Sequence, residues 1–183
     1  MASVLVPLAQ GCEELEAVTV VDLLRRAGIE VITASLDEQP VHASRGMTLI
    51  ADMTLDAALQ QEFDMIVLPG GLPGADHLRN DQRIIDTLKK MAASDRYTAA
   101  ICAAPRVLAD AGLLDGKRAT SFPGALDVSA VAALQYQEAA VVMDGKVITS
   151  RGPGTAMDFA LTLIETLVGK PVRDEVEAGL QRA

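Results

Sequence analysis

Short apolar runs alternate with longer amphipathic segments along almost the whole chain. The β-branched and aliphatic runs predict strands at 3–8, 29–35, 64–68 and 97–101. Between and after them, apolar positions spaced three or four apart predict helices at 14–27, 54–60, 82–93, directly after Cys102, at 156–168 and after Pro171. This alternation is typical of an α/β domain with a mostly parallel central sheet.

Two stretches break the alternation and predict antiparallel hairpins. Residues 40–43 and 47–51 are short strand-like segments on either side of a turn at 44–46. Residues 141–149 carry Asp144-Gly145, a pair that favours a tight two-residue hairpin turn. We find no internal repeat, low-complexity tract or linker, so the sequence predicts one domain over residues 1–183.

Composition and charge exclude several classes of protein. The formal net charge is -9, from 16 basic and 25 acidic residues, which argues against nucleic-acid binding because phosphates attract clustered Lys and Arg. No uninterrupted apolar run has the length of a membrane span. The N-terminus has no basic segment typical of a signal peptide, and two cysteines are too few for a disulfide scaffold, so we expect a cytoplasmic protein.

Cys102 is the strongest candidate for chemistry. It ends a strand of small residues and is followed by Ala103, Ala104 and Pro105, which begin a helix. Such a strand-to-helix turn exposes a nucleophile at the carboxyl end of a sheet, and backbone N–H groups at the start of the helix would lower the thiol pKa and hold an oxyanion. The alternative is a buried core cysteine, which is the commoner fate of an unpaired thiol.

A thiol nucleophile needs a partner for its proton. The two histidines, His42 and His77, fall in the predicted hairpin and a surface turn, which disfavours peptidase and glutaminase chemistry. Glu13, Glu14 and Glu16 follow the first strand at the same end of the sheet as Cys102. We expect two of them to lie at the start of the helix, where acidic side chains interact favourably with the helix dipole, and one to turn inward, where burial would keep it protonated.

Two glycine-rich loops, 69–74 and 151–155, border the predicted pocket. Neither has the spacing of a phosphate-binding loop, so we interpret both as rigid turns. Gly70 and Gly71 follow a central strand and are candidates to offer backbone N–H groups to an oxyanion. The Cys, His and carboxylate residues show no spacing typical of metal ligands, so no metal is expected.

Four motifs stand in a fixed order along the chain: 11–16 (Gly-Cys-Glu-Glu-Leu-Glu), 68–71 (Leu-Pro-Gly-Gly), 99–105 (Ala-Ala-Ile-Cys-Ala-Ala-Pro) and 149–155 (Thr-Ser-Arg-Gly-Pro-Gly-Thr). In content and order they resemble the ThiJ/PfpI superfamily, which belongs to the class I glutamine amidotransferase-like domains. The nearest branch resembles that of the Parkinsonism-associated protein deglycase and its bacterial relatives. The resemblance covers essentially the whole chain and implies a flavodoxin-like three-layer sandwich, usually a homodimer.

The resemblance also implies site residues and activities. It makes Cys102 the nucleophile and a protonated Glu16 its partner, with Gly70, Gly71 and Ala103 lining the pocket. Family members are described as cofactor-free glyoxalases and deglycases that act on methylglyoxal, glyoxal and their thiol or amine adducts, including glycated protein or nucleotide groups. They are also described as oxidative-stress sensors and chaperones, in which Cys102 would oxidise to the sulfinate. Phe122 departs from relatives that place a histidine near the cysteine.

Two further expectations concern Cys12 and the first helix. Cys12 ends the first strand, so it would approach the Cys102 pocket and could act as a resolving thiol; the alternative is a small turn residue that points elsewhere. The helix predicted at 14–27 is apolar around nearly its whole circumference between Leu15 and Leu24, more than one sheet face needs to cover. This feature also predicts a homodimer.

Overall fold

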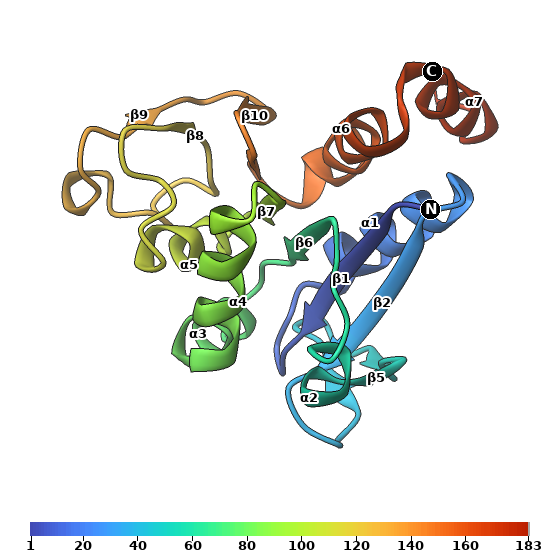
Figure 1. Cartoon of the computed structure of the whole chain (residues 1–183), viewed down its shortest axis with the longest axis horizontal. Coiled ribbons are helices and arrows are strands. Elements are labelled where there is room, and N and C mark those ends of the chain that lie inside the picture. The colour runs from blue at the N-terminus through green and yellow to red at the C-terminus, as the bar shows by residue number, and fades with distance from the viewer. Residues whose placement is uncertain (183) are drawn as a thin grey trace.

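A seven-stranded sheet forms the centre of the protein in a computed structural model that describes residues 1–182 (Figure 1). Its strand order is β10-β11-β7-β6-β1-β2-β5, and every neighbouring pair is parallel except β10 with β11. The strands are β1 (Ser3–Leu8), β2 (Glu30–Ser35), β5 (Met53–Thr54), β6 (Met65–Leu68), β7 (Tyr97–Ile101), β10 (Val141–Asp144) and β11 (Val147–Ser150).

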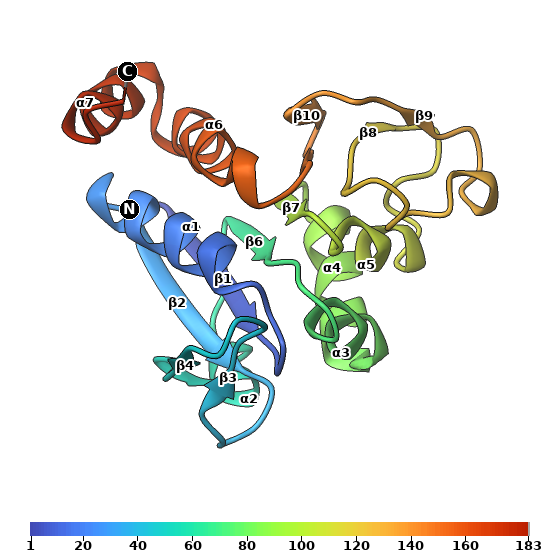
Figure 2. The same ribbon diagram turned by 180° about the vertical axis from the view of Figure 1, so that it is seen from behind.

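Helices cover both faces of this sheet, since successive side chains of a strand point to opposite faces. One apolar core joins the sheet to α1 (Glu14–Arg26), α6 (Ala156–Val168) and α7 (Lys170–Gly179). Figure 2 shows α1 lying over β1 on this face. A second core joins the other face to α2 (Leu55–Ala58), α3 (Gly74–Asn80), α4 (Gln82–Ala93) and α5 (Pro105–Asp110). The expected flavodoxin-like three-layer sandwich with a mostly parallel sheet is confirmed.

Both predicted hairpins are present. β3 (Val41–His42) and β4 (Thr48–Leu49) form a small antiparallel sheet of their own. In the second hairpin Asp144 pairs with Val147, so the turn residues are Gly145 and Lys146 instead of Asp144-Gly145. Gly145 has the positive φ of 60° that such a turn needs.

Some elements were not predicted. Residues 74–80 form α3, where the glycines and prolines before it indicated only a loop, and β5 precedes the predicted helix at 54–60. Two-residue strands β8 (Arg118–Ala119) and β9 (Gln135–Tyr136) pair in parallel beside the sheet. Short 3₁₀ helices lie at Val128–Ala130 and Pro153–Thr155.

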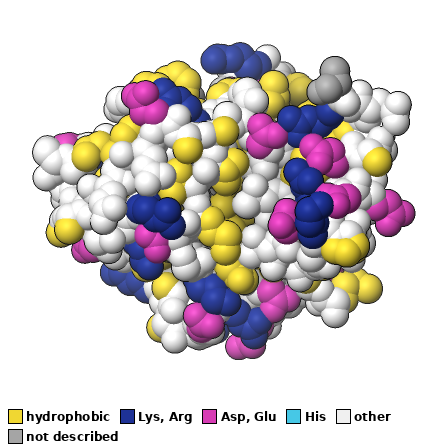
Figure 3. Space-filling view, turned by 90° about the horizontal axis from the view of Figure 1, so that it is seen from above, with side chains coloured by type: hydrophobic (Ala, Val, Ile, Leu, Met, Phe, Trp, Pro, Cys, Tyr) yellow, Lys and Arg dark blue, Asp and Glu magenta, His cyan; other side chains and the backbone are white. Residues whose placement is uncertain are grey.

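The surface over α6, α7 and β10 carries both hydrophobic and charged side chains. Figure 3 shows hydrophobic side chains running down the middle of this face, with acidic and basic side chains intermingled on either side. Within residues 1–182, none of the helices is long and apolar enough to cross a membrane. The same part of the chain contains no group of three or more His, Cys, Asp or Glu side chains placed to hold a metal ion.

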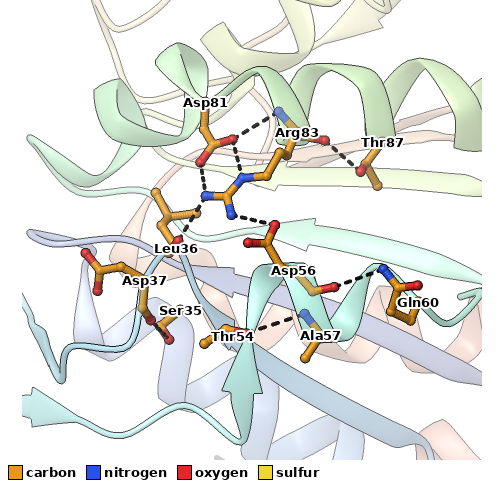
Figure 4. Close-up of polar contacts among 10 residues, drawn as sticks. All are labelled: Ser35, Leu36, Asp37, Thr54, Asp56, Ala57, Gln60, Asp81, Arg83 and Thr87. Atoms are coloured by element: carbon orange, nitrogen blue, oxygen red, sulfur yellow. Dashed lines mark hydrogen bonds and ion pairs between the residues drawn. The ribbon is translucent and has the colours of Figure 1, made fainter.

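Arg83 links the start of α4 to α2 and to the segment after β2 (Figure 4). Its guanidinium donates to the carboxylate of Asp81 at 2.6 Å, to that of Asp56 at 2.8 Å, and to the carbonyl of Leu36 at 2.9 Å. The hydrogen bonds that Arg83 donates to Asp81 and Asp56 raise the pKa of Arg83 further above its usual range. This network lies on the α4 face, away from the Cys102 elbow, and we assign it a structural role.

Candidate active site

Cys102 lies in a strained turn at the carboxyl edge of the sheet. Its φ is 63°, a left-handed conformation that a residue with a side chain rarely adopts. Two main-chain bonds hold it: the Cys102 amide donates to the Ser150 carbonyl at 3.0 Å, and its carbonyl accepts from the Phe122 amide at 2.9 Å. Cys102 is 9% exposed, and the small neighbours Ala103 and Ala104 are also buried. The predicted elbow between strand and helix is therefore present.

The sheet order brings the other motifs to this turn. Because β11, β7, β6 and β1 are neighbours, their carboxyl ends meet at one edge. Gly70, after β6, touches the elbow: a Cβ there would lie 2.7 Å from the Cβ of Cys102 and 2.8 Å from Oε2 of Glu16. Gly71 has a φ of 86°, and its amide and that of Ala103 hydrogen-bond to the Cys102 sulfur.

Glu16 is the acidic residue that turns inward. It is fully buried, its Oε2 accepts the Gly70 amide at 2.8 Å, and it hydrogen-bonds with the Cys102 thiol. Its other oxygen, Oε1, is buried without a hydrogen-bond partner among the described residues. Burial, with a smaller contribution from the charge of Glu13, raises the pKa of Glu16 to about 7, against the opposing hydrogen bonds from Gly70 and Cys102.

The Gly70 amide already donates its hydrogen bond to Glu16 and is not available to an oxyanion. Sequence reasoning offered both Gly70 and Gly71 as oxyanion donors, but the Gly70 N–H is held by Glu16. The remaining donors that reach the sulfur are the amides of Gly71 and Ala103. The sequence predicted that N–H groups at the start of the helix would stabilise the thiolate and an oxyanion. The amides of Gly71 and Ala103 are placed for this instead, because α5 is short and begins at Pro105, which has no N–H.

Cys102 and Glu16 cannot both be charged. Burial raises the pKa of Cys102 to about 12, and the negative charge of Glu16 and the hydrogen bond it accepts add to this rise. A neutral Glu16 removes the charge effect and donates its hydrogen bond instead, while Gly71 and Ala103 still stabilise a thiolate. The expected low thiol pKa therefore depends on Glu16 keeping the proton, and the two groups titrate as a pair.

Glu13 and Glu14 are buried, contrary to the expectation that they only decorate the start of α1. The Ser44 hydroxyl donates to Glu13 at 2.9 Å, and the Arg45 amide donates to Glu14 at 2.9 Å. Burial alone would raise the pKa of Glu14, but hydrogen bonds from its own amide, Arg45, Met47 and Ser44 outweigh it and lower that pKa. Both carboxylates thus fasten the β3–β4 turn beside the site.

Cys12 is 1% exposed and has unfavourable surroundings for a thiolate. Burial, and then the charges of Glu14, Glu13 and Glu16, raise its pKa to about 12. Its backbone is pressed against Gly74, where a Cβ would lie 2.7 Å from the Cys12 Cα. Both cysteines are free thiols. The resolving role of Cys12 stays a prediction, and its carboxylate neighbours work against it.

Two ion pairs that sequence reasoning missed join the helices after the two site loops. Arg106 on α5 donates to Asp76 on α3 at 2.9 Å, and Arg79 on α3 donates to Asp110 on α5 at 2.8 Å. They link the helix after the Gly70-Gly71 loop to the helix after the Cys102 elbow. Side-chain pairs between segments 30 residues apart leave no pattern in a single sequence.

The histidines lie away from this arrangement. His42 is exposed on β3, where its Nδ1 lies 3.1 Å from the Thr48 hydroxyl, and His77 is exposed on α3 instead of the predicted turn. Phe122, whose amide donates to the Cys102 carbonyl, occupies the place where the family resemblance suggested a histidine, so no imidazole stands there. The titratable side chain that interacts with the thiol is the carboxyl group of Glu16.

The fold and the site together define a flavodoxin-like α/β protein with a cysteine in a strained elbow and a buried glutamate beside it. The model of the DJ-1/PfpI family matches residues 2–166, and the chain belongs to this family. It is 45% identical over 179 residues to the Parkinson disease protein 7 homolog of Danio rerio, covering 96% of this chain and 95% of that protein. The crystal structure of Drosophila melanogaster DJ-1beta superposes with a TM-score of 0.93 at 42% identity, covering 100% of this chain and 98% of that one.

Other relatives differ in length or are named for an enzymatic activity. Protein DJ-1 homolog A of Arabidopsis thaliana is 44% identical over 96% of this chain, which spans only 45% of that relative's length. The glutathione-independent glyoxalase DJR-1.2 of Caenorhabditis elegans is 36% identical over 168 residues, covering 92% of this chain and 89% of that protein.

Proposed function

We propose that this protein is a cofactor-independent glyoxalase and deglycase, which converts methylglyoxal, glyoxal and their thiol or amine adducts to 2-hydroxy acids. The observation that carries the proposal is the fully buried Glu16, which interacts with the Cys102 thiol and whose Oε1 has no hydrogen-bond partner among the described residues. A carboxyl group placed this way can hold a proton at neutral pH and pass it to a reacting atom. The similarity to a C. elegans glyoxalase supports the same activity.

The first step joins the substrate to the thiol. The Cys102 thiolate adds to the aldehyde carbon, a C–S bond forms, and the carbonyl electron pair moves to oxygen. The amides of Gly71 and Ala103 stabilise the charge that develops, and Glu16 gives its proton to that oxygen. The product is a hemithioacetal on Cys102 and an ionised Glu16.

The second step moves a proton between adjacent carbons. The Glu16 carboxylate takes the proton from the former aldehyde carbon and returns it to the neighbouring carbonyl carbon. The hydroxyl proton moves from the former aldehyde oxygen to the neighbouring oxygen in the same isomerisation, which leaves a 2-hydroxy thioester on Cys102. Water hydrolyses the thioester, so lactate leaves when the substrate is methylglyoxal and glycolate leaves when it is glyoxal. The sum is one dicarbonyl plus one water, with no external oxidant or reductant.

The test is lactate formation from methylglyoxal by purified protein without added thiol cofactor. We expect turnover by the wild type and a loss of at least about a thousandfold in Cys102→Ser, because a serine hydroxyl is a far weaker nucleophile without an imidazole base. Cys12→Ser is the matched control and should retain the wild-type rate. Equal lactate formation by wild type and Cys102→Ser would contradict the proposal.

A redox-sensing chaperone is the second candidate, favoured by the same unpartnered oxygen of Glu16. Two equivalents of peroxide convert the Cys102 thiolate to a sulfinate and release two waters. A protonated Glu16 would donate to a sulfinate oxygen and favour arrest at that stage. A protein that forms this sulfinate under mild peroxide but makes no lactate would support the sensor over the enzyme.

We also propose a homodimer built on α1. Leu15 and Val18 are 49% and 46% exposed on the side of α1 that does not face the sheet. They adjoin a groove of about 310 Å³ that Val18, Val21, Leu49 and Ile50 help to line. An acidic side chain in an apolar interface is strongly unfavourable. Sedimentation equilibrium should give twice the chain mass, and Val18→Asp should dissociate the dimer while Val128→Asp should not. A clean monomer for the wild type would contradict the proposed dimer.

We also propose that the protein is located in the cytoplasm. Its two free thiols suit that reducing compartment.

A further inference from the structure

Two exposed apolar side chains flank the Cys102 elbow, one on each side along the sheet. Leu72 is 53% exposed and follows the Gly70-Gly71 pair after β6. Phe122 is 49% exposed and lies against Gly152, which follows β11. Since β6 and β11 are the two neighbours of β7, Leu72 lies on the loop beside Cys102 on one side, and Phe122 packs against the loop on the other side.

Phe122 is held firmly. Its amide donates to the Cys102 carbonyl at 2.9 Å, and the carbonyl of the preceding residue, Ser121, accepts from the Tyr136 hydroxyl at 3.1 Å. The phenyl ring lies so close to Gly152 that a Cβ there would be 3.3 Å from Cδ2 of the ring. The ring is therefore supported on one side by backbone and open to solvent on the other.

Leu72 is anchored by its neighbour. Gly71 has a positive φ, and a Cβ there would lie 2.4 Å from the Glu13 amide nitrogen, so the loop that presents Leu72 is closely packed. An uncharged apolar substituent on a substrate would bury surface against Leu72 and Phe122.

We propose that Phe122, aided by Leu72, is a specificity-determining residue that binds the apolar substituent of a 2-oxoaldehyde. The preferred substrates are then 2-oxoaldehydes with an aryl or branched alkyl group, ahead of glyoxal itself. The assignment of turnover rests on the proposed function. The binding preference at the thiol does not, because it is measured on alkylation of Cys102, which needs no turnover.

Two measurements separate the binding preference at Cys102 from the turnover of 2-oxoaldehydes. The first compares alkylation of Cys102 by N-benzyl chloroacetamide and by chloroacetamide, each rate divided by that with glutathione and read by peptide mass spectrometry. The second compares kcat/KM for phenylglyoxal and glyoxal. Both are made on wild type, Phe122→Ala, Phe122→His and Leu72→Ala, with Val128→Ala as control because Val128 is an exposed apolar residue further along the segment that carries Phe122.

We expect the wild type to favour the benzyl reagent, and this preference to fall about tenfold in Phe122→Ala, less in Leu72→Ala, and not at all in Val128→Ala. Phe122→His should fall between wild type and Phe122→Ala. If Phe122→Ala does not fold, the alkylation preferences of Leu72→Ala and Phe122→His test the inference in its place. An unchanged alkylation preference in the Phe122 and Leu72 variants overturns the inference. Absence of turnover in the wild type with the alkylation preference intact overturns only the proposed glyoxalase activity.

Discussion

Gly70→Ala is expected to destabilise the protein by about 1–3 kcal/mol and to slow Cys102 alkylation at least about tenfold. The new Cβ would lie 2.7 Å from the Cβ of Cys102 and 2.8 Å from both Oε2 of Glu16 and the Ile101 carbonyl oxygen. Two of these three atoms belong to the reacting pair and the third is backbone, so none can move without changing the site. The 2.8 Å hydrogen bond from the Gly70 amide to Glu16 would be disturbed with them.

Urea denaturation and the rate of iodoacetamide labelling measure the two effects of Gly70→Ala. Gly154→Ala is the matched control: it lies in the loop after β11, and a Cβ there would meet nothing within 4 Å. It should change stability by less than about 0.5 kcal/mol and leave labelling unchanged. If Gly70→Ala behaves like Gly154→Ala, the close packing around Cys102 does not set its reactivity.

Glu16→Gln is expected to change how stability depends on pH. The folded pKa of Glu16, about 7, is above its unfolded value, so the folded pair holds a proton that the unfolded chain has released. This contribution to stability is fully present below about pH 4.5 and is lost as pH rises to about 7. A shift of this size corresponds to about 3 kcal/mol. The wild type should therefore lose about that much relative to Glu16→Gln between pH 4.5 and 8.

Glu14→Gln should show the opposite dependence. Hydrogen bonds from the β3–β4 turn lower the pKa of Glu14, so its contribution is present above the unfolded pKa and is lost in acid. Guanidinium denaturation curves at several pH values, with the wild type in parallel, give both differences. If the two variants follow the wild type with equal offsets at every pH, the buried carboxyl of Glu16 is not protonated in the folded state.

The sequence was sufficient for the features that depend on local chemistry. Small residues before and after Cys102, with Pro105 next, predict the elbow because only such residues fit there, and helix 82–93 has clear apolar periodicity that the structure reproduces. Sequence reasoning missed α3, because Gly70, Gly71, Pro73 and Gly74 are typical of a loop and the seven-residue helix has a weak pattern of its own.

Long-range contacts account for most of the rest. Glu13, Glu14 and Glu16 are close in sequence and chemically alike, and nothing local distinguishes the one that meets Cys102. Glu14 is buried only because the turn at Ser44 and Arg45, some thirty residues later, folds over it. The Gly70 amide could serve either an oxyanion or Glu16, and only the three-dimensional structure assigns it to Glu16.

The central claim is that Glu16 keeps the proton it shares with Cys102, leaving a thiolate ready to attack an aldehyde. The most direct measurement is the ultraviolet absorbance of the thiolate as pH is raised, in the wild type, Cys12→Ser and Cys102→Ser. The account predicts that absorbance rises with the first proton lost by the pair in wild type and Cys12→Ser but not in Cys102→Ser. A first step without absorbance, followed by thiolate only near pH 12, would show that Cys102 holds the proton and would contradict the account.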